Sequence, residues 1–144
     1  RSEGAVMAYE ALQVVDGHYI ASTSFASTDQ YCGVFYSTAT NTPPDVRITI
    51  TSGGFCNGIL DDLGAETSGS AVRVVVYGKS KLRFSSTHGA IAVNDPIYVR
   101  GDGTFNNVSS SGFYPVGWSL DSLAADTSGI ITGWVQPSIN QRTT

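Results

Sequence analysis

Charged residues are scarce in this chain, and basic residues are fewer than acidic ones. Only 14% of the 144 residues are charged, with 8 Lys and Arg against 12 Asp and Glu, so the net charge is −4 at pH 7. A general nucleic-acid binder owes its affinity to basic side chains that neutralise phosphates. The charge balance therefore argues against nucleic acid as a partner.

Long apolar runs and histidine-based motifs are also lacking. The apolar runs are a few residues long, whereas a membrane-spanning helix needs about 20, so we expect no membrane partner. Neither His18 nor His88 stands in an HExxH or HxH pattern, and no Gly-x-Ser-x-Gly elbow occurs. Gly78-Lys79-Ser80 lacks the upstream glycine of a phosphate-binding loop because Arg73 stands there. We therefore predict that the chain is not an enzyme and uses no metal or other cofactor.

Cysteine is limited to Cys32 and Cys56, which lie in different segments. Their spacing allows a disulfide but does not establish one. We expect two small buried thiols, as in a protein made inside a cell.

Short apolar segments separated by turn residues are what the chain contains. Residues 46–51 and 79–84 alternate apolar and polar side chains, as a half-buried strand does. Residues 71–77 are rich in valine and predict a central strand that Gly78 interrupts. Further strand signals lie at residues 31–36, 91–93, 97–99, 114–118 and 130–135. The close spacing of these strands predicts an all-β class and a compact β-barrel.

Ten residues of the chain occur twice. Residues 60–69, LDDLGAETSG, return as residues 120–129, LDSLAADTSG. A Gly-aliphatic or Gly-aromatic step, at Gly58 and Gly117, precedes each copy, and a β-like run follows each. The pattern predicts that one strand–loop–strand unit is present twice. The i,i+3 leucines of each copy also allow a helical turn in each loop.

The repeated loops collect acidic side chains, namely Asp61, Asp62, Glu66, Asp121 and Asp126. Paired carboxylates can hydrolyse glycosides or bind Ca²⁺, but this spacing matches no Ca²⁺ loop. Because the acidic residues recur beside turns, we interpret them chiefly as acceptors for backbone N–H groups. Metal binding and catalysis remain as alternatives.

Two other features suggest contacts with a protein partner. Residues 1–24 hold short apolar runs broken by Gly4 and Gly17, and we expect an N-terminal arm or edge strand there. A β domain over residues 25–137 and a tail over residues 138–144 follow. Basic side chains alternate along one strand, which places them on one face, as a solvated surface or as a contact to an acidic protein. They are Lys79, Lys81 and Arg83.

Several segments, in order, resemble the small decoration, or cement, proteins of tailed-phage capsids. Residues 74–82, VVVYGKSKL, are similar to a family strand that ends in Gly and continues through a basic, apolar pattern. Residues 89–99 look like the family's Asp-Pro hairpin, and residues 101–105 look like its polar Gly turn. Residues 115–120, PVGWSL, look like its strand before the final loop, with residues 58–60 as an earlier copy. The resemblance covers roughly residues 30–136.

The resemblance implies a β-tulip-like barrel that forms homotrimers and needs no cofactor. Such trimers bind the major capsid protein on the outer surface of an expanded shell, at threefold and quasi-threefold positions. They stabilise the shell against DNA pressure, and their virions assemble in the host cytoplasm. We therefore expect a capsid decoration protein whose capsid or protomer contacts include Tyr9, Leu12, Val14, Lys79, Lys81 and Arg83. Removal of residues 1–20 should then leave a folded domain that attaches more weakly.

Other functions compete with this one. The main alternative is a β-sandwich carbohydrate- or receptor-binding module of a phage fibre or secreted enzyme, and a small hydrolase is the third. The aromatic residues of a sugar platform would be Trp118, Trp134, Tyr36 and Tyr98. Both tryptophans stand beside apolar strand residues, so we expect them in a core or an interface. The tripeptide Arg100-Gly101-Asp102 is of the integrin-binding type, but its neighbours predict a tight hairpin tip.

Overall fold

One long strand, β5 (Ala71–Phe84), organises the whole chain. The structure is a computed structural model that describes residues 13–38, 45–48, 52–61 and 65–137. Within these ranges no helix is long and apolar enough to cross a membrane. The remaining elements are β1 (Gln13–Ala21), η1 (Ser27–Asp29), β2 (Gly33–Thr38), β3 (Asp45–Ile48), β4 (Gly58–Leu60), β6 (Pro96–Val99), β7 (Phe105–Asn106), β8 (Gly117–Ser119) and β9 (Gly129–Val135).

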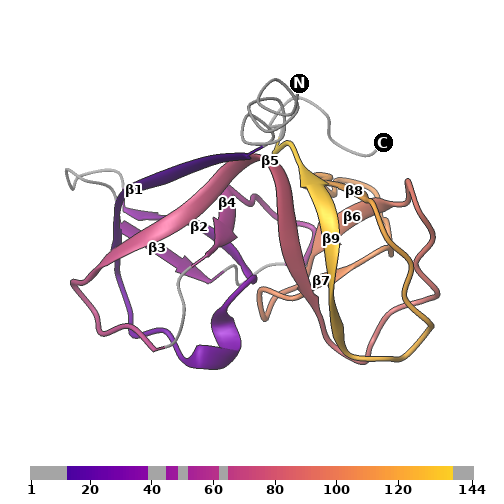
Figure 1. Cartoon of the computed structure of the whole chain (residues 1–144), viewed down its shortest axis with the longest axis horizontal. Helices are drawn as coiled ribbons and strands as arrows, with labels where there is room; N and C mark the ends of the chain where they lie inside the picture. Colours follow the sequence, from indigo (N-terminus) through magenta and orange to yellow (C-terminus); the bar gives the residue numbers. More distant parts are fainter. Residues whose placement is uncertain (1–12, 39–44, 49–51, 62–64, 138–144) are drawn as a thin grey trace, which may run out of the picture.

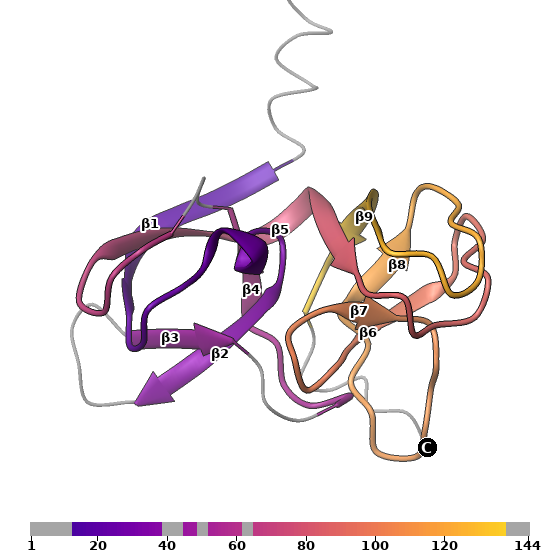
Figure 2. The ribbon, with the colours of Figure 1, turned by 90° about the horizontal axis from the view of Figure 1, so that it is seen from below.

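Strand pairing closes the sheet into two barrels that share β5. The first barrel runs β1-β3-β2-β4-β5 and is closed where β1 pairs with the first half of β5. The second runs β5-β7-β6-β8-β9 and is closed where β9 pairs with the second half of β5. Figure 1 shows the first barrel on the left and the second on the right, and Figure 2 shows the same two lobes from below. The predicted all-β, barrel-like class is confirmed.

The two barrels repeat the same pairing pattern. Matched pairs are Gly33–Ile59 with Pro96–Trp118, Val34–Gly58 with Ile97–Gly117, and Ile59–Val75 with Trp118–Trp134. The residues before β2 and β6 match as well. Tyr31 (φ 67°) donates its N–H to the Leu60 carbonyl, and Asn94 (φ 71°) donates its N–H to the Ser119 carbonyl. The predicted duplication of a strand–loop–strand unit is therefore present and extends to a whole barrel.

Aligning the two copies of the ten-residue repeat and aligning the matched strands give correspondences that differ by one residue. The matched pairs place Ser119, and not Leu120, at the position of Leu60. Leu60 is 1% exposed in the first barrel, whereas Leu120 is 37% exposed. The strand partner decides which side chain turns inward, so identical loop residues need not have identical surroundings.

The two repeated loops also differ in conformation. Glu66 of the first loop bridges to Phe25, whereas Leu123 of the second bridges to Ile91. Residues 120–129 hold no helical turn, so that prediction is wrong for the second loop. In the first loop, residues 62–64 lie outside the described residues. The strand predicted over residues 91–93 is reduced to the single bridge at Ile91, which leads directly into a turn.

Gly78 does not interrupt its strand, as the sequence suggested it would. It takes φ 101°, a value that glycine adopts without strain because it has no Cβ. On one side it pairs with Gln13 of β1, and on the other with Val135 of β9. The first and last strands of the described chain therefore meet at the residue where the barrels join.

The residues 13–21 belong to the first barrel and not to an arm. They form β1, which is antiparallel to β5 and parallel to β3. Tyr19 and Ala21 are buried in the core of that barrel. The boundary predicted at residue 24 is corrected accordingly, because closure of the barrel requires this strand. The rest of the predicted arm, with Tyr9 and Leu12, and the tail over residues 138–144 lie outside the described residues.

Cys32 and Cys56 are free, buried thiols, as predicted. Burial raises the pKa of each from 9.0 to about 12. The neutral thiol is thus favoured in the folded state, and its contribution to stability is complete below about pH 9 and is lost as the pH rises towards 12.

We expect an alkaline loss of stability that depends on these thiols. Between about pH 9 and pH 11, the free energy of unfolding of the wild type should fall more steeply than that of the Cys32→Ala/Cys56→Ala variant. The difference should be roughly 1–4 kcal/mol per thiol. Urea unfolding followed at several pH values measures both slopes. The two proteins differ only at these two positions, so equal slopes would contradict the assignment.

Candidate functional site

Two carboxylates of the repeated loops, those of Asp61 and Asp121, have partners close by. Asp61 lies 3.7 Å from the Arg73 guanidinium, and Asp121 accepts the backbone N–H of Ser122 at 2.8 Å. Among the residues that the structure describes, no group of three or more His, Cys, Asp or Glu could hold a metal ion. The interpretation of these carboxylates as turn acceptors is confirmed for Asp121, while Asp62 lies outside the described ranges.

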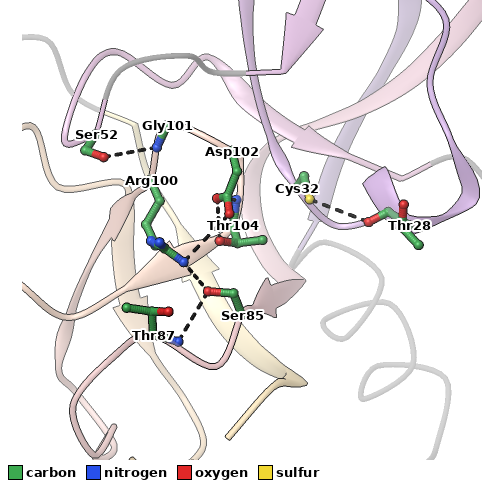
Figure 3. Close-up of polar contacts among 9 residues, drawn as sticks. All are labelled: Thr28, Cys32, Ser52, Ser85, Thr87, Arg100, Gly101, Asp102 and Thr104. Atoms are coloured by element: carbon green, nitrogen blue, oxygen red, sulfur yellow. Dashed lines mark hydrogen bonds and ion pairs between the residues drawn. The ribbon is translucent and has the colours of Figure 1, made fainter. Parts of the chain in front are cut away.

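The Arg100-Gly101-Asp102 tripeptide lies at the tip of the β6–β7 hairpin, as predicted. Thr104 donates its N–H and its Oγ1 hydroxyl to Asp102 Oδ1 at 3.0 and 2.6 Å. Arg100 lies 3.7 Å from Asp102 and donates to Ser85 Oγ (Figure 3). Partial burial alone would raise the pKa of Asp102, but the Thr104 hydrogen bonds and the Arg100 charge outweigh it and lower the pKa. The chain itself therefore engages both charged groups of the tripeptide.

The same hairpin tip attaches the second barrel to the first. Gly33 donates its N–H to the Gly103 carbonyl at 2.8 Å, and Gly101 donates its N–H to Ser52 Oγ at 3.1 Å. A Cβ on Gly103 would lie 2.5 Å from Ile48 Cγ2. Sequence reasoning located the hairpin but not the surface on which it packs.

The predicted basic stripe is real, but its three cations differ in availability. Lys79, Lys81 and Arg83 all lie on the second half of β5. Lys81 is exposed, with its Nζ 5.6 Å from the centre of the Tyr31 ring. Arg83 is half-buried, and its Nε donates to the Gln30 carbonyl at 2.7 Å. Arg83 therefore holds the segment after η1 against β5, and Lys81 is the more accessible cation.

Val14 joins this stripe through aromatic neighbours that sequence reasoning missed. It is 49% exposed and stands opposite Tyr77 on β5, which is also exposed. The Tyr77 ring meets Trp134 edge-on, with 5.6 Å between centroids, and Lys79 pairs with Trp134 across β5 and β9. We call Val14, Tyr77, Lys79 and Trp134 the crossing patch because they surround the Gly78 crossing. Two predicted contact residues, Val14 and Lys79, thus share one surface.

The two tryptophans are not in the barrel core, so of the two places expected for them an interface is the one that remains. Trp118 and Trp134 stack with 6.1 Å between ring centroids and 18° between planes. Trp118 is 37% exposed and lines an open cleft of about 480 Å³ on the second barrel. The other lining residues are Asn94, Pro96, Pro115, Gly117 and Gln136. We call this feature the tryptophan cleft.

The predicted four-residue sugar platform does not form. Tyr98 is buried in the second barrel, and Tyr36 stacks on Tyr19 in the first, with 5.7 Å between ring centroids. The stacked pair Trp118 and Trp134 is all that remains of it. An aromatic face beside backbone and amide groups can still bind a protein or a neutral ligand.

The fold therefore defines an all-β protein built from two five-stranded barrels with one strand in common. The same fold occurs in a protein whose structure is described as the crystal structure of the head fiber gp8.5 N base in bacteriophage phi29. The TM-score is 0.58 at 12% sequence identity, over 90% of this chain and 99% of that chain. No family model and no curated protein matches the chain significantly. At this identity the likeness establishes a shared fold.

Proposed function

We propose that this chain is a structural protein of a bacteriophage head and binds the outside of the shell. The observation that carries the proposal is the fold shared with a phage head fibre base over 90% of the chain. The sequence resemblance to capsid decoration proteins points to the same location through a different set of residues. A general head-associated role draws support from both, whereas the decoration role rests on the sequence resemblance.

In its finer form, the proposal is a homotrimer that ties neighbouring major capsid subunits together at threefold and quasi-threefold positions. Three weak contacts made at once act through effective concentration, which strengthens binding by roughly 10²–10⁴ over a single contact. Closed cyclic symmetry also prevents growth into fibres. Such attachment would stabilise the expanded shell against the pressure of packaged DNA, on the outer surface of the virion.

The crossing patch has a chemistry that suits such a contact. Val14 and Tyr77 offer exposed apolar area, and Lys79 and Lys81 offer positive charge beside it. Residues 1–12, which include Tyr9 and Leu12, join the barrel at Gln13, next to Val14. Cations at the rim of an interface speed association with an acidic surface and make binding salt-sensitive.

Co-sedimentation with purified phage heads tests the proposal. We expect the wild-type protein to pellet with expanded heads of its own phage and to leave precursor shells unbound. Charge reversal in Lys79→Glu/Lys81→Glu should weaken binding by roughly tenfold or more at about 0.15 M salt, because both cations face the shell. No pelleting of the wild type with expanded heads would remove the proposal.

A matched control separates this patch from the overall charge of the molecule. Arg73 lies on the first half of β5, and its side chain is 61% exposed. Arg73→Glu lowers the net charge by two, as Lys79→Glu alone does, and it should leave shell binding within about twofold of the wild type, since the residue is outside the crossing patch. An equal loss in Arg73→Glu and in Lys79→Glu would show that no particular surface of the protein is used.

A further inference from the structure

The first barrel buries part of its outer surface beneath the second. Ile59 and Val75 pair across β4 and β5 and are both 0% exposed. With the buried Cys56, they belong to the core cluster of the second barrel and not to that of the first. Removal of such apolar side chains from water stabilises the contact between the two barrels. The second barrel therefore covers the outer face of β4 and β5. We call this covered face the seat of the first barrel.

The β6–β7 hairpin is the element that occupies this seat. Gly33 donates its N–H to the Gly103 carbonyl at 2.8 Å. A Cβ on Gly33 would lie 2.9 Å from Val99 Cγ2 and 3.3 Å from Phe105 Cζ. Gly33 pairs with Ile59 of the seat, so its close approach to Val99 and Phe105 places the hairpin against the seat.

The tryptophan cleft is the same seat in the second barrel. Matched strand pairs place Pro96 where the first barrel has Gly33, Gly117 where it has Gly58, Trp118 where it has Ile59, and Trp134 where it has Val75. Asn57 and Val116 also match, since each donates its N–H at 2.8 Å to the matched carbonyls of Val34 and Ile97. Pro115 of the cleft therefore corresponds to the buried Cys56.

The seat of the second barrel is not covered within the described chain. Trp118 is 37% exposed where its counterpart Ile59 is 0% exposed. The stacked tryptophans also present more apolar area than the Ile–Val pair that they replace. Among the described residues that line the cleft there is no Asp, Glu, Lys or Arg, so their chemistry does not favour a charged ligand.

We infer that the tryptophan cleft binds a second copy of this chain, in the manner in which the first barrel binds the second. The element that would enter is the strand pair β2 and β3 of the second copy, called here the β2–β3 hairpin, because these two strands are the counterparts of β6 and β7. The matched pairs Tyr36–Val46 and Val99–Phe105 place Tyr36 at the position of Val99, and Tyr36 is exposed. This inference rests on the proposed homotrimer and assigns its interface.

The resulting contact joins two different surfaces. The cleft belongs to the second barrel of one copy, and the hairpin belongs to the first barrel of the next. Such head-to-tail contacts close into a ring when the rotation between copies permits it. Each copy then fills one cleft and offers one hairpin, and a closed ring leaves no tryptophan cleft exposed.

Sedimentation equilibrium of the full chain, without shells, tests this arrangement. At about 50 µM we expect the wild type to be an oligomer, and Trp118→Arg and Tyr36→Arg each to be monomers. An equimolar mixture of the two variants should form one-to-one dimers at higher concentration. Trp118→Arg keeps an intact hairpin and Tyr36→Arg keeps an intact cleft, so one productive contact remains. Val108→Arg, which alters an exposed apolar residue of another loop, should remain an oligomer.

Thermal unfolding verifies that each variant is folded. Should Tyr36→Arg fail to fold, hydrogen exchange on the wild type provides a second measurement, in which protection of the backbone N–H groups of residues 116–118 should rise with protein concentration. A monomeric wild type, an oligomeric Trp118→Arg, or concentration-independent exchange would overturn the inference. Glycan binding by a monomeric wild type that Trp118→Arg abolishes would overturn it in favour of a carbohydrate-binding cleft.

Shell binding distinguishes failure of this inference from failure of the proposed function. Suppose that Trp118→Arg stays an oligomer and the wild type still pellets with expanded heads. The proposed interface is then wrong, and the head-associated role is retained. Suppose instead that both variants are monomers, as expected, but the wild type does not bind heads. The interface is then retained, and the head-associated role is wrong.

Discussion

Gly117→Ala is expected to destabilise the protein strongly. A Cβ at this position would lie 1.7 Å from the carbonyl oxygen of Trp134, which is backbone and cannot rotate away. Strands β8 and β9 would have to separate, and their pairing is part of the wall of the second barrel. We expect a loss of about 3 kcal/mol or more in the free energy of unfolding, a large fraction of the roughly 5–15 kcal/mol available to a domain.

Gly58 occupies the matching place in the first barrel and should behave similarly. Its Cβ would meet Val74 Cγ1 at 2.4 Å and the Val75 carbonyl oxygen at 2.6 Å. The contacts are longer than at Gly117, so we expect a smaller but still large loss, of about 2 kcal/mol or more. The Gly–apolar step found twice in the sequence is thus explained: each barrel needs a residue without a side chain where these strands approach.

Urea unfolding of both variants at 25 °C provides the measurement, with Gly89→Ala as the matched control. A Cβ at Gly89 would meet nothing nearer than Asn107 Oδ1 at 3.5 Å, an ordinary contact. The control should stay within about 0.5 kcal/mol of the wild type. If Gly117→Ala were as stable as Gly89→Ala, the close packing of β8 on β9 would be wrong.

Removal of residues 1–20 is expected to abolish cooperative folding, which reverses the expectation from the sequence. The deletion takes almost all of β1 (Gln13–Ala21), including the buried Tyr19, and leaves β3 and the first half of β5 without the strand that closes the barrel. Loss of the Tyr19 ring alone should cost about 3 kcal/mol or more, and the open strand edges should promote aggregation.

Removal of residues 1–12 is the control for this deletion. It leaves the described barrels intact and takes away Tyr9 and Leu12, so a single cooperative transition should persist while attachment to expanded heads weakens. Circular dichroism during heating, together with limited proteolysis, reports the fold of both deletions. A cooperative transition in the protein without residues 1–20 would show that β1 is dispensable.

Local patterns predicted the strands whose faces differ in polarity. The alternation over residues 79–84 and the valine-rich run over 71–77 both lie in β5, because period-two burial leaves a direct trace in sequence. The sequence of β1 indicates only an arm or an edge strand, because its role depends on distant pairing with β5, from Ile20 with Ala71 to Gln13 with Gly78. The sequence also predicts a break at Gly78, because a glycine that ends a strand and one that bends it look alike in sequence.

The candidate site was predicted only where it follows one strand. Lys79, Lys81 and Arg83 were found because they alternate along β5. Tyr77 and Trp134 were missed because their contact depends on β9 lying beside β5. One signal is present in the sequence. Aligning the two Gly–apolar steps matches Trp118 with Ile59, which is buried, and so marks Trp118 as a position where a partner could cover the side chain.

The sharing of β5 has a thermodynamic consequence for the two barrels. A strand that provides a wall to both cannot detach from one without removing a neighbour from the other, and Gly78 pairs with both at once. The halves of the chain are therefore expected to melt as one cooperative unit, although their sequence order would allow two independent modules. Force applied to either terminal strand of the described chain acts first at Gly78. Strain from one end is therefore transmitted to both barrels together.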